Sequence, residues 1–503
     1  MKILSIDNVR EADNYTIKNE PIKSIDLMER ASKQLFYWIK KRLKKSSSII
    51  VFAGPGNNGG DGLALARMLS KASYKVEVKI IKFTDKFSDD FNFNLKRLQE
   101  IKEITCEEID DVKKLSDLNP DAVIIDAIFG SGLSRPVKGL AADVIHFINK
   151  HTGVTIAIDV PSGLFADEPS VNGISTIVRA DYTLSFQFPK LAFMFPENDQ
   201  FVGDWHILDI GLHPEFINDV KTKNYFVLKR DIIANIKSRS KFSHKGTYGH
   251  ALLIAGSYGK VGAAVLATKA CLRSGLGLLH VHIPKVAYQI MQISCPEAML
   301  SIDRYDNYFS EVPDLSMFNA VGIGPGLGME QQSTMAFKLL IQSTKLPMVI
   351  DADALNILAD NKTWLAFLPK NSVLTPHPKE FQRLVGKWQN DFEKIEMQKQ
   401  LAIKFGIVVL LKGAYSSVCL PSGEVYFNST ANPGMATGGS GDVLTGLITG
   451  LIATGYSSAQ AAIIGAFIHG LAGDYAAKKL GQTAMTAGDI IDFIPKAFKK
   501  ISN

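Results

Sequence analysis

Cysteine is scarce in this chain, and the few cysteines follow no recognisable pattern. The 503 residues include four cysteines. No two of them are spaced as C-x-x-C: Cys106, Cys271, Cys295 and Cys419. A disulfide framework and a cysteine-based zinc site are therefore excluded, and a cytoplasmic, reducing location is expected. The start of the chain lacks the apolar run of a secretory signal, because charged residues recur between Asp7 and Asp13.

Charge is absent from one long stretch, residues 443–473. Its length would suit a membrane span, but Gly455, Tyr456, Ser457 and Ser458 divide it into two segments that are too short to cross a bilayer. Its many small residues suit helices that pack closely within a protein. We expect two buried helices here and no membrane association.

The overall composition is that of a folded, globular protein. Hydrophobic residues make up 46% and charged residues 21% of the chain, which excludes extensive disorder and fibrous repeats. At roughly 150 residues per domain, the length allows about two to four domains.

The net charge of +6 is unevenly distributed. Residues 1–220 carry 27 Lys and Arg against 31 Asp and Glu, a net charge of −4, whereas residues 221–503 carry 29 against 19, a net charge of +10. The basic residues of the second half are dispersed and are not interleaved with aromatic residues, so nucleic-acid binding is not expected. Small phosphorylated ligands account for the positive charge more simply.

In the first half, short β-branched runs alternate with helical segments, as in a parallel sheet with crossover helices. The pattern is interrupted at residues 211–223, a polar segment with Gly and Pro, and we place a domain boundary there. We predict a first domain over residues 1–220. Its predicted strands are 48–54, 74–80, 121–130 and 154–163, and its predicted helices are 24–45, 62–73, 88–103 and 139–149.

A second alternating series follows, and we predict a second α/β domain over residues 225–503. No internal repeat relates it to the first, so the chain resembles a fusion of two modules. The predicted strands lie within 250–256, 276–284, 319–326, 346–355, 371–378 and 406–414, and the predicted helices are 260–275, 330–343, 391–405, 440–454, 457–477 and 486–498.

A glycine-rich loop, Gly54 to Gly62, directly follows the first predicted strand and opens a helix. It reads GPGNNGGDG and matches the dinucleotide-binding pattern G-x-G-x-x-G. An ordinary dinucleotide dehydrogenase is not favoured, because residues 76–83 read VEVKIIKF and lack the acidic residue that should end the second strand. The amides and carboxylate of Asn57, Asn58 and Asp61 instead cluster at a helix N-terminus, where a phosphate is favoured.

Two further strands of the first half end in polar residues. Asp126 ends one, and Asp159 ends another, followed by Ser162. One aspartate in such a place could simply cap a turn. Because side chains beyond the carboxyl ends of parallel strands converge on one crevice, three such loops together favour a binding site.

NNGGDG, DAIFGSGL and DVPSG, in this order, resemble the NAD(P)H-hydrate epimerase domain over about residues 1–215. The resemblance implies a Rossmann-like, three-layer α/β domain that binds hydrated NADH or NADPH. It implies a substrate site formed by Asn57, Asn58, Gly59, Gly60, Asp61, Gly130, Ser131, Gly132, Leu133, Ser134, Arg135, Pro136 and Asp159.

The same resemblance implies a potassium ion bound through Asn58, Asp126 and Ser162. Such oxygen-rich ligands suit a hard cation. Asp159 is the candidate for proton transfer during epimerisation, although a residue that only positions the ligand would leave the same trace in the sequence.

A second glycine-rich segment, NPGMATGGSGD, ends at Asp442 and opens the predicted helix 440–454. Glycines at a helix start leave backbone N–H groups free to hold a phosphoryl oxyanion. Asp442 in the first turn could accept a proton from an attacking hydroxyl. It could also be a simple helix cap, but four glycines within residues 434–441 exceed what capping requires.

Other loops of the second half supply partners for this segment. The loop after strand 250–256 is no Walker A loop, because Ile254 and Val261 replace its first glycine and its Ser or Thr. Over about residues 225–503, the chain resembles the ADP-dependent NAD(P)H-hydrate dehydratase domain, which has a ribokinase-like fold. The motifs that carry the resemblance are, in order, HKGTYGHALLIAGS, GIGPGLG, DADALN, TPHPKE, LKGA and NPGMATGGSGD.

This second resemblance implies that the hydrated dinucleotide contacts Ala263, Gly326, His377 and Asp442. It implies that the adenine nucleotide contacts Lys412, Gly413, Ala414, Tyr415, Ser416 and Gly441. Magnesium is expected as the phosphate counter-ion. The fusion of the two domains favours ADP over ATP.

The sequence thus predicts a bifunctional enzyme, an isomerase and a lyase, that repairs damaged nicotinamide cofactors. The first domain would interconvert the R and S hydrates, and the second would use ADP to dehydrate the S form. Two alternatives stay open: a ribokinase-type vitamin-pathway kinase with an accessory domain, and a first domain that is a non-catalytic scaffold. We expect a homo-oligomer whose ligands are hydrated NADH or NADPH and ADP.

Overall fold

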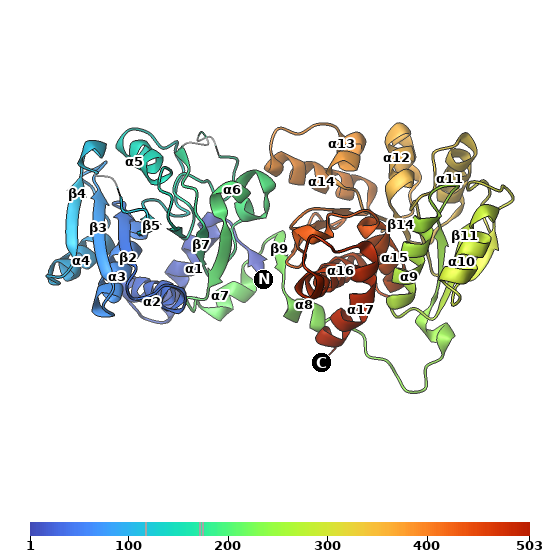
Figure 1. Ribbon diagram of the computed structural model, residues 1–503, viewed down its shortest axis with the longest axis horizontal. Helices are drawn as coiled ribbons and strands as arrows, with labels where there is room; N and C mark the ends of the chain where they lie inside the picture. The colour runs from blue at the N-terminus through green and yellow to red at the C-terminus, as the bar shows by residue number, and fades with distance from the viewer. Residues whose placement is uncertain (116–117, 171–172, 174–175, 503) are drawn as a thin grey trace. The chain divides into compact units, whose positions relative to one another are not determined.

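The chain forms two compact units in this computed structural model, which describes residues 1–115, 118–170, 173 and 176–502. The N-terminal unit comprises Lys2–Thr222 and Asn390–Phe392, and the C-terminal unit comprises Met1, Lys223–Gln389 and Glu393–Asn503. Both are α/β units built on largely parallel sheets (Figure 1).

The sheet of the N-terminal unit is parallel throughout. From β2 the chain first adds strands on one side of the sheet, β3 and β4, and then adds β5 to β8 on the other side. The direction of the strand order thus changes between β2 and β5, and open α/β sheets bind ligands at such a switch point. The spatial order is β4 (Thr105–Ile109), β3 (Lys75–Ile81), β2 (Ser48–Ala53), β5 (Val123–Ala127), β6 (Thr155–Ile158), β7 (Tyr182–Phe186) and β8 (Asp204–Leu208).

Helices cover both faces of this sheet. Ile49 and Val51 of β2 belong to one buried cluster, and the alternate residues Ile50 and Phe52 belong to another, as the two-residue period of a strand requires. The unit is therefore the three-layer α/β domain that the sequence predicts. Its helices are α1 (Ile6–Asn19), α2 (Ser24–Arg42), α3 (Asn57–Lys71), α4 (Asp89–Gln99), α5 (Leu140–Ile148), α6 (Asp199–Val202) and α7 (Pro214–Asp219), and a short strand, β1 (Lys2–Ile3), precedes them.

The helix α1 and the strands β4, β7 and β8 were not predicted, and the glycine-rich loop differs from its prediction. The sequence predicts a helix from residue 62, whereas α3 begins at Asn57 and includes Gly59, Gly60 and Gly62. Glycine is unfavourable inside a helix by roughly 1 kcal/mol, but here it allows close packing: a Cβ on Gly62 would lie 2.7 Å from the Cβ of Ala127 in β5.

The sheet of the C-terminal unit is parallel except around one antiparallel hairpin, β17 and β18. Its strands run in the order β9 (Asn224–Val227), β18 (Val425–Asn428), β17 (Ser417–Cys419), β16 (Val408–Leu411), β15 (Val373–Leu374), β14 (Met348–Ile350), β13 (Ala320–Ile323), β10 (His250–Ile254), β11 (Leu278–Ile283) and β12 (Met299–Ile302). The order reverses between β13 and β10, so this unit has a switch point as well.

Alternate residues of β10 are buried on both faces of the sheet, with Leu253 in the cluster formed by α9, α15, α16 and α17. The helices of the unit are α8 (Lys229–Ile233), α9 (Val261–Arg273), α10 (Tyr288–Ser294), α11 (Gln331–Ser343), α12 (Ala352–Asp360), α13 (Pro378–Val385), α14 (Asp391–Phe405), α15 (Ser440–Ala453), α16 (Ser458–Leu480) and α17 (Ala487–Ile501).

The charge-free stretch forms α15 and most of α16, both largely buried, as predicted. Two glycines of α15, Gly446 and Gly450, lie one helical turn apart and face α9. A Cβ on Gly446 would overlap the carbonyl oxygen of Ala267, and one on Gly450 would overlap the hydroxyl of Ser274. The two helices thus touch backbone to backbone. Across the described residues, no helix combines the length and the hydropathy that crossing a membrane requires.

Gly446→Ala should therefore destabilise the C-terminal unit, although alanine is the better helix former. Inserting a methyl group into a packed core costs about 1–3 kcal/mol. Gly262→Ala, in α9, is the matched control, because nothing lies within 4 Å of its added Cβ. Urea unfolding followed by circular dichroism should show a lower midpoint for the first variant and an unchanged or higher midpoint for the second. Equal midpoints would contradict the close packing.

Candidate active sites

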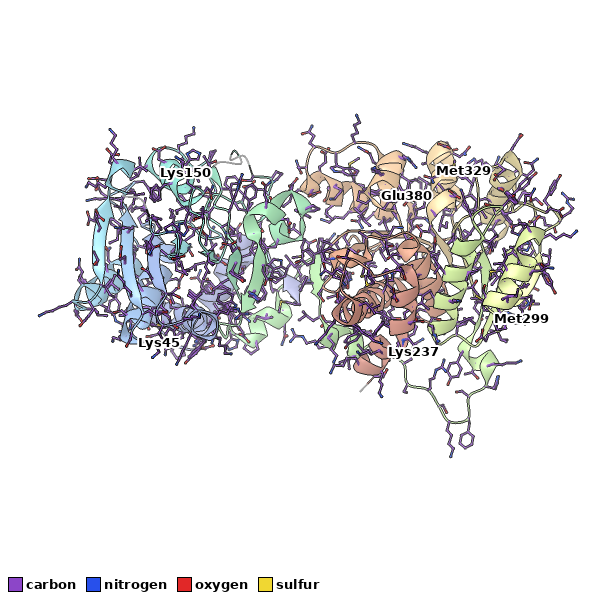
Figure 2. All side chains as sticks on the ribbon, in the orientation of Figure 1. Lys45, Lys150, Lys237, Met299, Met329 and Glu380 are labelled. Carbon is purple, nitrogen blue, oxygen red and sulfur yellow. The ribbon has the colours of Figure 1, made fainter. Side chains whose placement is uncertain are left out.

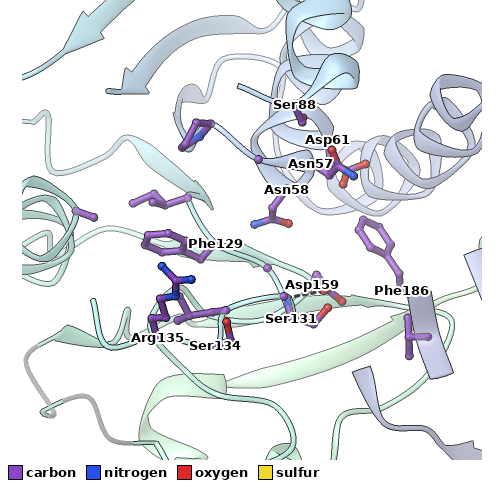
Figure 3. A pocket seen from close by; sticks show the side chains of 18 of the residues that line it. Asn57, Asn58, Asp61, Ser88, Phe129, Ser131, Ser134, Arg135, Asp159 and Phe186 are labelled. Carbon is purple, nitrogen blue, oxygen red and sulfur yellow. Dashed lines mark hydrogen bonds between the residues drawn. The ribbon is translucent and has the colours of Figure 1, made fainter. Parts of the chain in front are cut away.

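A cavity of about 930 Å³ opens in the N-terminal unit at the carboxyl ends of β2 and β5. Most of the predicted substrate residues line it, including Asn57, Asn58 and Asp61 on α3 and Asp159 after β6 (Figure 3). The whole predicted segment from Gly130 to Pro136 lines it as well: Gly130, Ser131, Gly132, Leu133, Ser134, Arg135 and Pro136. Gly59 and Gly60 are buried in α3 beneath the surface of the cavity.

The loop between β2 and α3 is held tightly against the loop after β5. A Cβ on Gly54 would overlap the carbonyl oxygen of Ile128, and a Cβ on Gly59 would overlap that of Gly54. This close approach brings the N-terminus of α3 to the cavity. No side chain caps that end, because the N-cap residue is Gly56. The free N–H groups at the start of α3 and the positive end of the helix dipole therefore favour an anionic ligand.

Asp126 and Ser162 form a buried polar pair close behind the cavity. The Ser162 hydroxyl donates to one Asp126 oxygen at 2.6 Å, and the Ser162 amide donates to the other at 2.8 Å. Among the described residues, Asp126 has no ion-pair partner. Burial raises the pKa of Asp126 to about 6, although the bonds from Ser162 oppose the shift.

Asn58, the third predicted cation ligand, lies against Gly130, where an added Cβ would be 3.2 Å from its side-chain oxygen. Its amide nitrogen is buried and has no hydrogen-bond partner among the described residues. Buried amide groups are nearly always paired, so this nitrogen is available to donate a hydrogen bond to a bound molecule.

Asp159 has a left-handed backbone, with φ of 65°. That conformation is rare for residues other than glycine and is found mostly at functional sites. Its carboxylate accepts from the Ser131 amide at 3.0 Å and pairs with Lys190 at 3.0 Å. Burial alone would raise the pKa of Asp159, but the charge of Lys190 and the bond from Ser131 outweigh burial and hold that pKa below its usual value.

Sequence reasoning missed four charged residues that line the cavity: Asp13, Lys86, Lys138 and Lys190. Lys190 is almost completely buried, with 1% of its surface exposed. A lysine within the apolar run FPKLAFMF was a signal that could have revealed it. Asp13 lies in a helix that the sequence pattern did not predict, and no local motif marks it.

In the C-terminal unit, the segment from Gly438 to Gly441 forms the start of α15, with Gly439 as a left-handed N-cap that offers no side-chain bond. Asp442 occupies the first turn of the helix, as predicted. Burial raises the pKa of Asp442 to about 7, the charge of Asp351 adds to the shift and that of Lys412 opposes it.

Lys412 and Asp351, which follow β16 and β14, form an ion pair at 2.9 Å beside this helix start. Thr445 of α15 donates to the other Asp351 oxygen at 2.7 Å. A Cβ on Gly441 would lie 3.2 Å from the Lys412 nitrogen, so the structure brings Lys412, Gly441 and Asp442 together.

Ala263, in α9 after β10, and Gly326, after β13, flank the switch point and lie next to each other: a Cβ on Gly326 would lie 3.1 Å from that of Ala263. Asp353 relates this pair to the group formed by Lys412, Gly441 and Asp442. It pairs with Lys260 at 3.1 Å, and its charge helps to raise the pKa of Asp442.

His377 is the N-cap of α13, where its Nδ1 atom accepts from the Lys379 amide at 3.1 Å. Glu380, labelled in Figure 2, accepts in turn from the His377 amide at 2.8 Å. Burial and the charge of Lys412 lower the pKa of His377. His377 is thus a helix cap that also lies within the electrostatic reach of Lys412.

The predicted adenine-nucleotide segment forms the tight turn between β16 and β17. The Gly413 amide donates to the Ser416 hydroxyl at 3.2 Å, and that hydroxyl donates back to the Gly413 carbonyl at 3.0 Å. Ala414 lies within this turn, and the Tyr415 ring lies 6.2 Å from that of Phe226.

Comparison with known proteins gives a family match for each half of the chain. The family model described as NAD(P)H-hydrate dehydratase matches residues 251–496, and that described as YjeF-related protein N-terminus matches residues 24–192. The bifunctional NAD(P)H-hydrate repair enzyme of Moorella thermoacetica is 34% identical over 100% of this chain and 97% of its own. The chain belongs to the bifunctional NAD(P)H-hydrate repair enzyme family.

Other members of the family match the chain over nearly its whole length. The repair enzyme of Escherichia coli is 29% identical over 97% of this chain and 92% of its own. Among solved structures, the ADP/ATP-dependent NAD(P)H-hydrate dehydratase of Bacillus subtilis is 28% identical and covers 55% of this chain and 98% of its own, with a TM-score of 0.48.

The close approach of Gly54 to Ile128 leads to a prediction. Gly54→Ala should force the loop after β2 away from the loop after β5, weaken dinucleotide binding to the N-terminal unit at least tenfold and lower the unfolding midpoint. Gly173→Ala, outside the cavity lining, is the control, because nothing in the described part of the chain lies within 4 Å of its added Cβ. Isothermal titration with NADPH as a substrate analogue would measure the difference; equal affinities would show that the loop can shift at no cost.

Proposed function

We propose that this chain repairs hydrated NADH and NADPH in two steps. The N-terminal unit interconverts the R and S hydrates, and the C-terminal unit dehydrates the S hydrate with ADP, yielding AMP, phosphate and the reduced dinucleotide. The observation that carries the proposal is the match to bifunctional repair enzymes over the whole chain, with a polar site at the switch point of each sheet.

In the N-terminal unit, the α3 N-terminus and the segment 130–136 bind the dinucleotide, and Asp159 carries out proton transfer while the configuration at C6 of the damaged ring is inverted. Lys190 and the Ser131 amide hold the Asp159 carboxylate in place. Gly59 and Gly60 act indirectly, through packing. A Cβ on Gly59 would overlap the carbonyl oxygen of Gly54, and one on Gly60 would lie 2.9 Å from the sulfur of Met28 in α2.

A potassium ion fits the group Asn58, Asp126 and Ser162. One carboxylate, one amide and one hydroxyl are hard oxygen donors of low total charge, which suits a monovalent cation. Within the described residues, no three His, Cys, Asp or Glu side chains are grouped as a stronger metal site would require. The cation would neutralise the buried Asp126 charge and orient Asn58 at the floor of the cavity.

Asp126→Ala should lower the epimerisation rate about tenfold or more and leave dehydration of the S hydrate unchanged. Replacing potassium chloride with tetramethylammonium chloride should have the same effect on the wild type and no added effect on the variant. Chromatographic separation of the two hydrates over time would measure it. If the variant epimerises at the wild-type rate, Asp126 has a purely structural role and the cation-site assignment is wrong.

In the C-terminal unit, Asp442 removes the proton from the hydroxyl of the S hydrate as that oxygen attacks the β-phosphoryl group of ADP. The backbone N–H groups of 438–441 stabilise the charge that develops on the phosphoryl oxygens, and Lys412 neutralises part of it. Phosphate then leaves with a ring proton, and the double bond of the reduced nicotinamide is restored. Magnesium, when bound with ADP, supplies charge neutralisation.

The remaining predicted residues are part of the same proposal. Ala263, Gly326 and His377 would contact the dinucleotide, and the turn 412–416 would contact the adenine nucleotide. The domain bounds 1–220 and 225–503, the cytoplasmic location and a homo-oligomeric state stay predictions from the sequence.

Asp442→Asn should collapse ADP-dependent dehydration, because asparagine keeps the size of the side chain and loses its basicity. Loss of a general base costs about 10²- to 10⁴-fold in rate. The return of reduced-nicotinamide absorbance with ADP and the S hydrate measures it. R/S epimerisation by the same preparation should be unchanged. A loss below about tenfold would make Asp442 a helix cap.

The pH dependence follows from the same carboxyl group. A base must be ionised to act, and Asp442 has a pKa of about 7. The dehydration rate should therefore fall as pH drops through about 7 and level off above it, whereas a group with an ordinary aspartate pKa would stay active down to about pH 4. A flat profile between pH 5 and 8 would contradict the assignment.

The alternative of a ribokinase-type vitamin-pathway kinase gives a different product. That enzyme would release a stable phosphate ester, whereas repair releases inorganic phosphate together with the reduced dinucleotide. Incubation with hydrated NADH, magnesium and either ADP or ATP separates the two. No recovery of absorbance with either nucleotide would overturn the proposed repair function.

A further inference from the structure

Asp13 is the one acidic residue that α1 contributes to the lining of the N-terminal cavity, as far as the described residues go. It shares the lining with Asp159, which enters from the loop after β6. The two carboxyl groups thus come from separate elements and reach the same space. The inference below rests on the proposed epimerase function of this unit.

The two carboxyl groups differ in their partners. Asp159 is held by the Lys190 ammonium and the Ser131 amide, both at 3.0 Å. Asp13 has no hydrogen bond and no ion pair within the described part of the chain, so its carboxyl is free to turn toward a ligand. Asp61, which also lines the cavity, is in contrast mostly buried in α3 and lies 3.4 Å from the Ser32 hydroxyl.

The same difference sets their protonation. Lys190 and the bond from Ser131 overcome burial and keep the pKa of Asp159 below its usual value. Burial and the charge of Asp159 raise the pKa of Asp13 to about 6, against the opposing charge of Lys190. One carboxylate is thus ionised at a pH where the other still holds a proton, as in other acid–base pairs of carboxyl groups.

Interconversion of the R and S hydrates needs both an acid and a base. The ring nitrogen can expel the C6 hydroxyl only if that oxygen gains a proton, and water can add to the opposite face only if it loses one. We propose that Asp13 is the acid of this step and Asp159 the base.

The step balances without an oxidant or a further reactant. The Asp13 proton moves to the leaving hydroxyl as the C6–O bond breaks, which forms water and a ring iminium. A water molecule then adds to C6 from the other face and gives a proton to Asp159. Proton exchange with solvent returns both groups to their starting states.

The test uses the full chain, the purified R hydrate and no ADP, with formation of the S hydrate followed chromatographically against an enzyme-free blank. Asp13→Asn should lower the R-to-S rate at least 100-fold, within the range for loss of an acid. Asp13→Glu should restore part of it. Glu11→Gln is the matched control: it removes one carboxylate from the exposed side of the same helix and should retain the wild-type rate.

Three further readouts separate catalysis from structure. The wild-type rate should fall as pH rises past about 6, because the acid loses its proton, and Asp13→Asn should lack this fall. The groups that act on Asp13 are Asp159, Asp61 and Lys190. The variant should melt at or above the wild-type temperature, because it removes a repulsion between like charges. Its dehydration of the S hydrate with ADP should be normal.

The outcomes distinguish the two proposals. A wild-type enzyme that forms no S hydrate overturns the epimerase function, and the role of Asp13 with it. If the wild type epimerises and the R-to-S rate of Asp13→Asn is within tenfold of the wild-type rate, only the role of Asp13 is overturned. An Asp13→Asn variant that is inactive and melts well below wild type, together with a wild-type rate that does not fall above pH 6, assigns Asp13 a structural role and equally overturns the proposal.

Discussion

Close backbone contact at the carboxyl end of a parallel sheet is the constraint on which both sites depend. In the N-terminal unit, Gly54 leaves room for the carbonyl oxygen of Ile128, and in the C-terminal unit Gly324 leaves room for that of Asp351. Any side chain at either position would push neighbouring loops apart. Because these loops meet, the helix start at Asn57 and the aspartate at 351 reach the space where a ligand can be held.

Burying carboxylates at such a place carries an electrostatic cost, and the two units offset it differently. Asp159 and Asp351 each have a lysine partner, at 3.0 Å and 2.9 Å. Asp126 has only hydrogen bonds from neutral groups, which is the reason a cation suits it. Asp442 stands near a like charge, so burial and repulsion together move its pKa toward neutrality. Similar residues thus acquire separate chemical roles from their surroundings alone.

Much of the architecture could be predicted from the sequence, because long alternating patterns and glycine-rich strand ends are local signals. The helix predicted at 391–405 matches α14, and the charge-free stretch forms buried helices. The start of α3 could not be predicted, since glycine propensity opposes a helix and only the packing against β5 explains it. Asp13 and Lys190 were missed for a related reason: both act on Asp159, which lies far from each of them in the chain, and no local spacing encodes that contact.

The glycine contact between α9 and α15 has a consequence for how the second site responds to ligands. Ala263 is the third residue of α9, and Asp442 is the third residue of α15. At the contact between Gly446 and Ala267 no side chain separates the two backbones, so the helices cannot move closer together there. The polypeptide backbone itself therefore sets a lower limit on the distance between the two helix starts. A movement that closes the site around a bound nucleotide has to come from the loops that follow the strands.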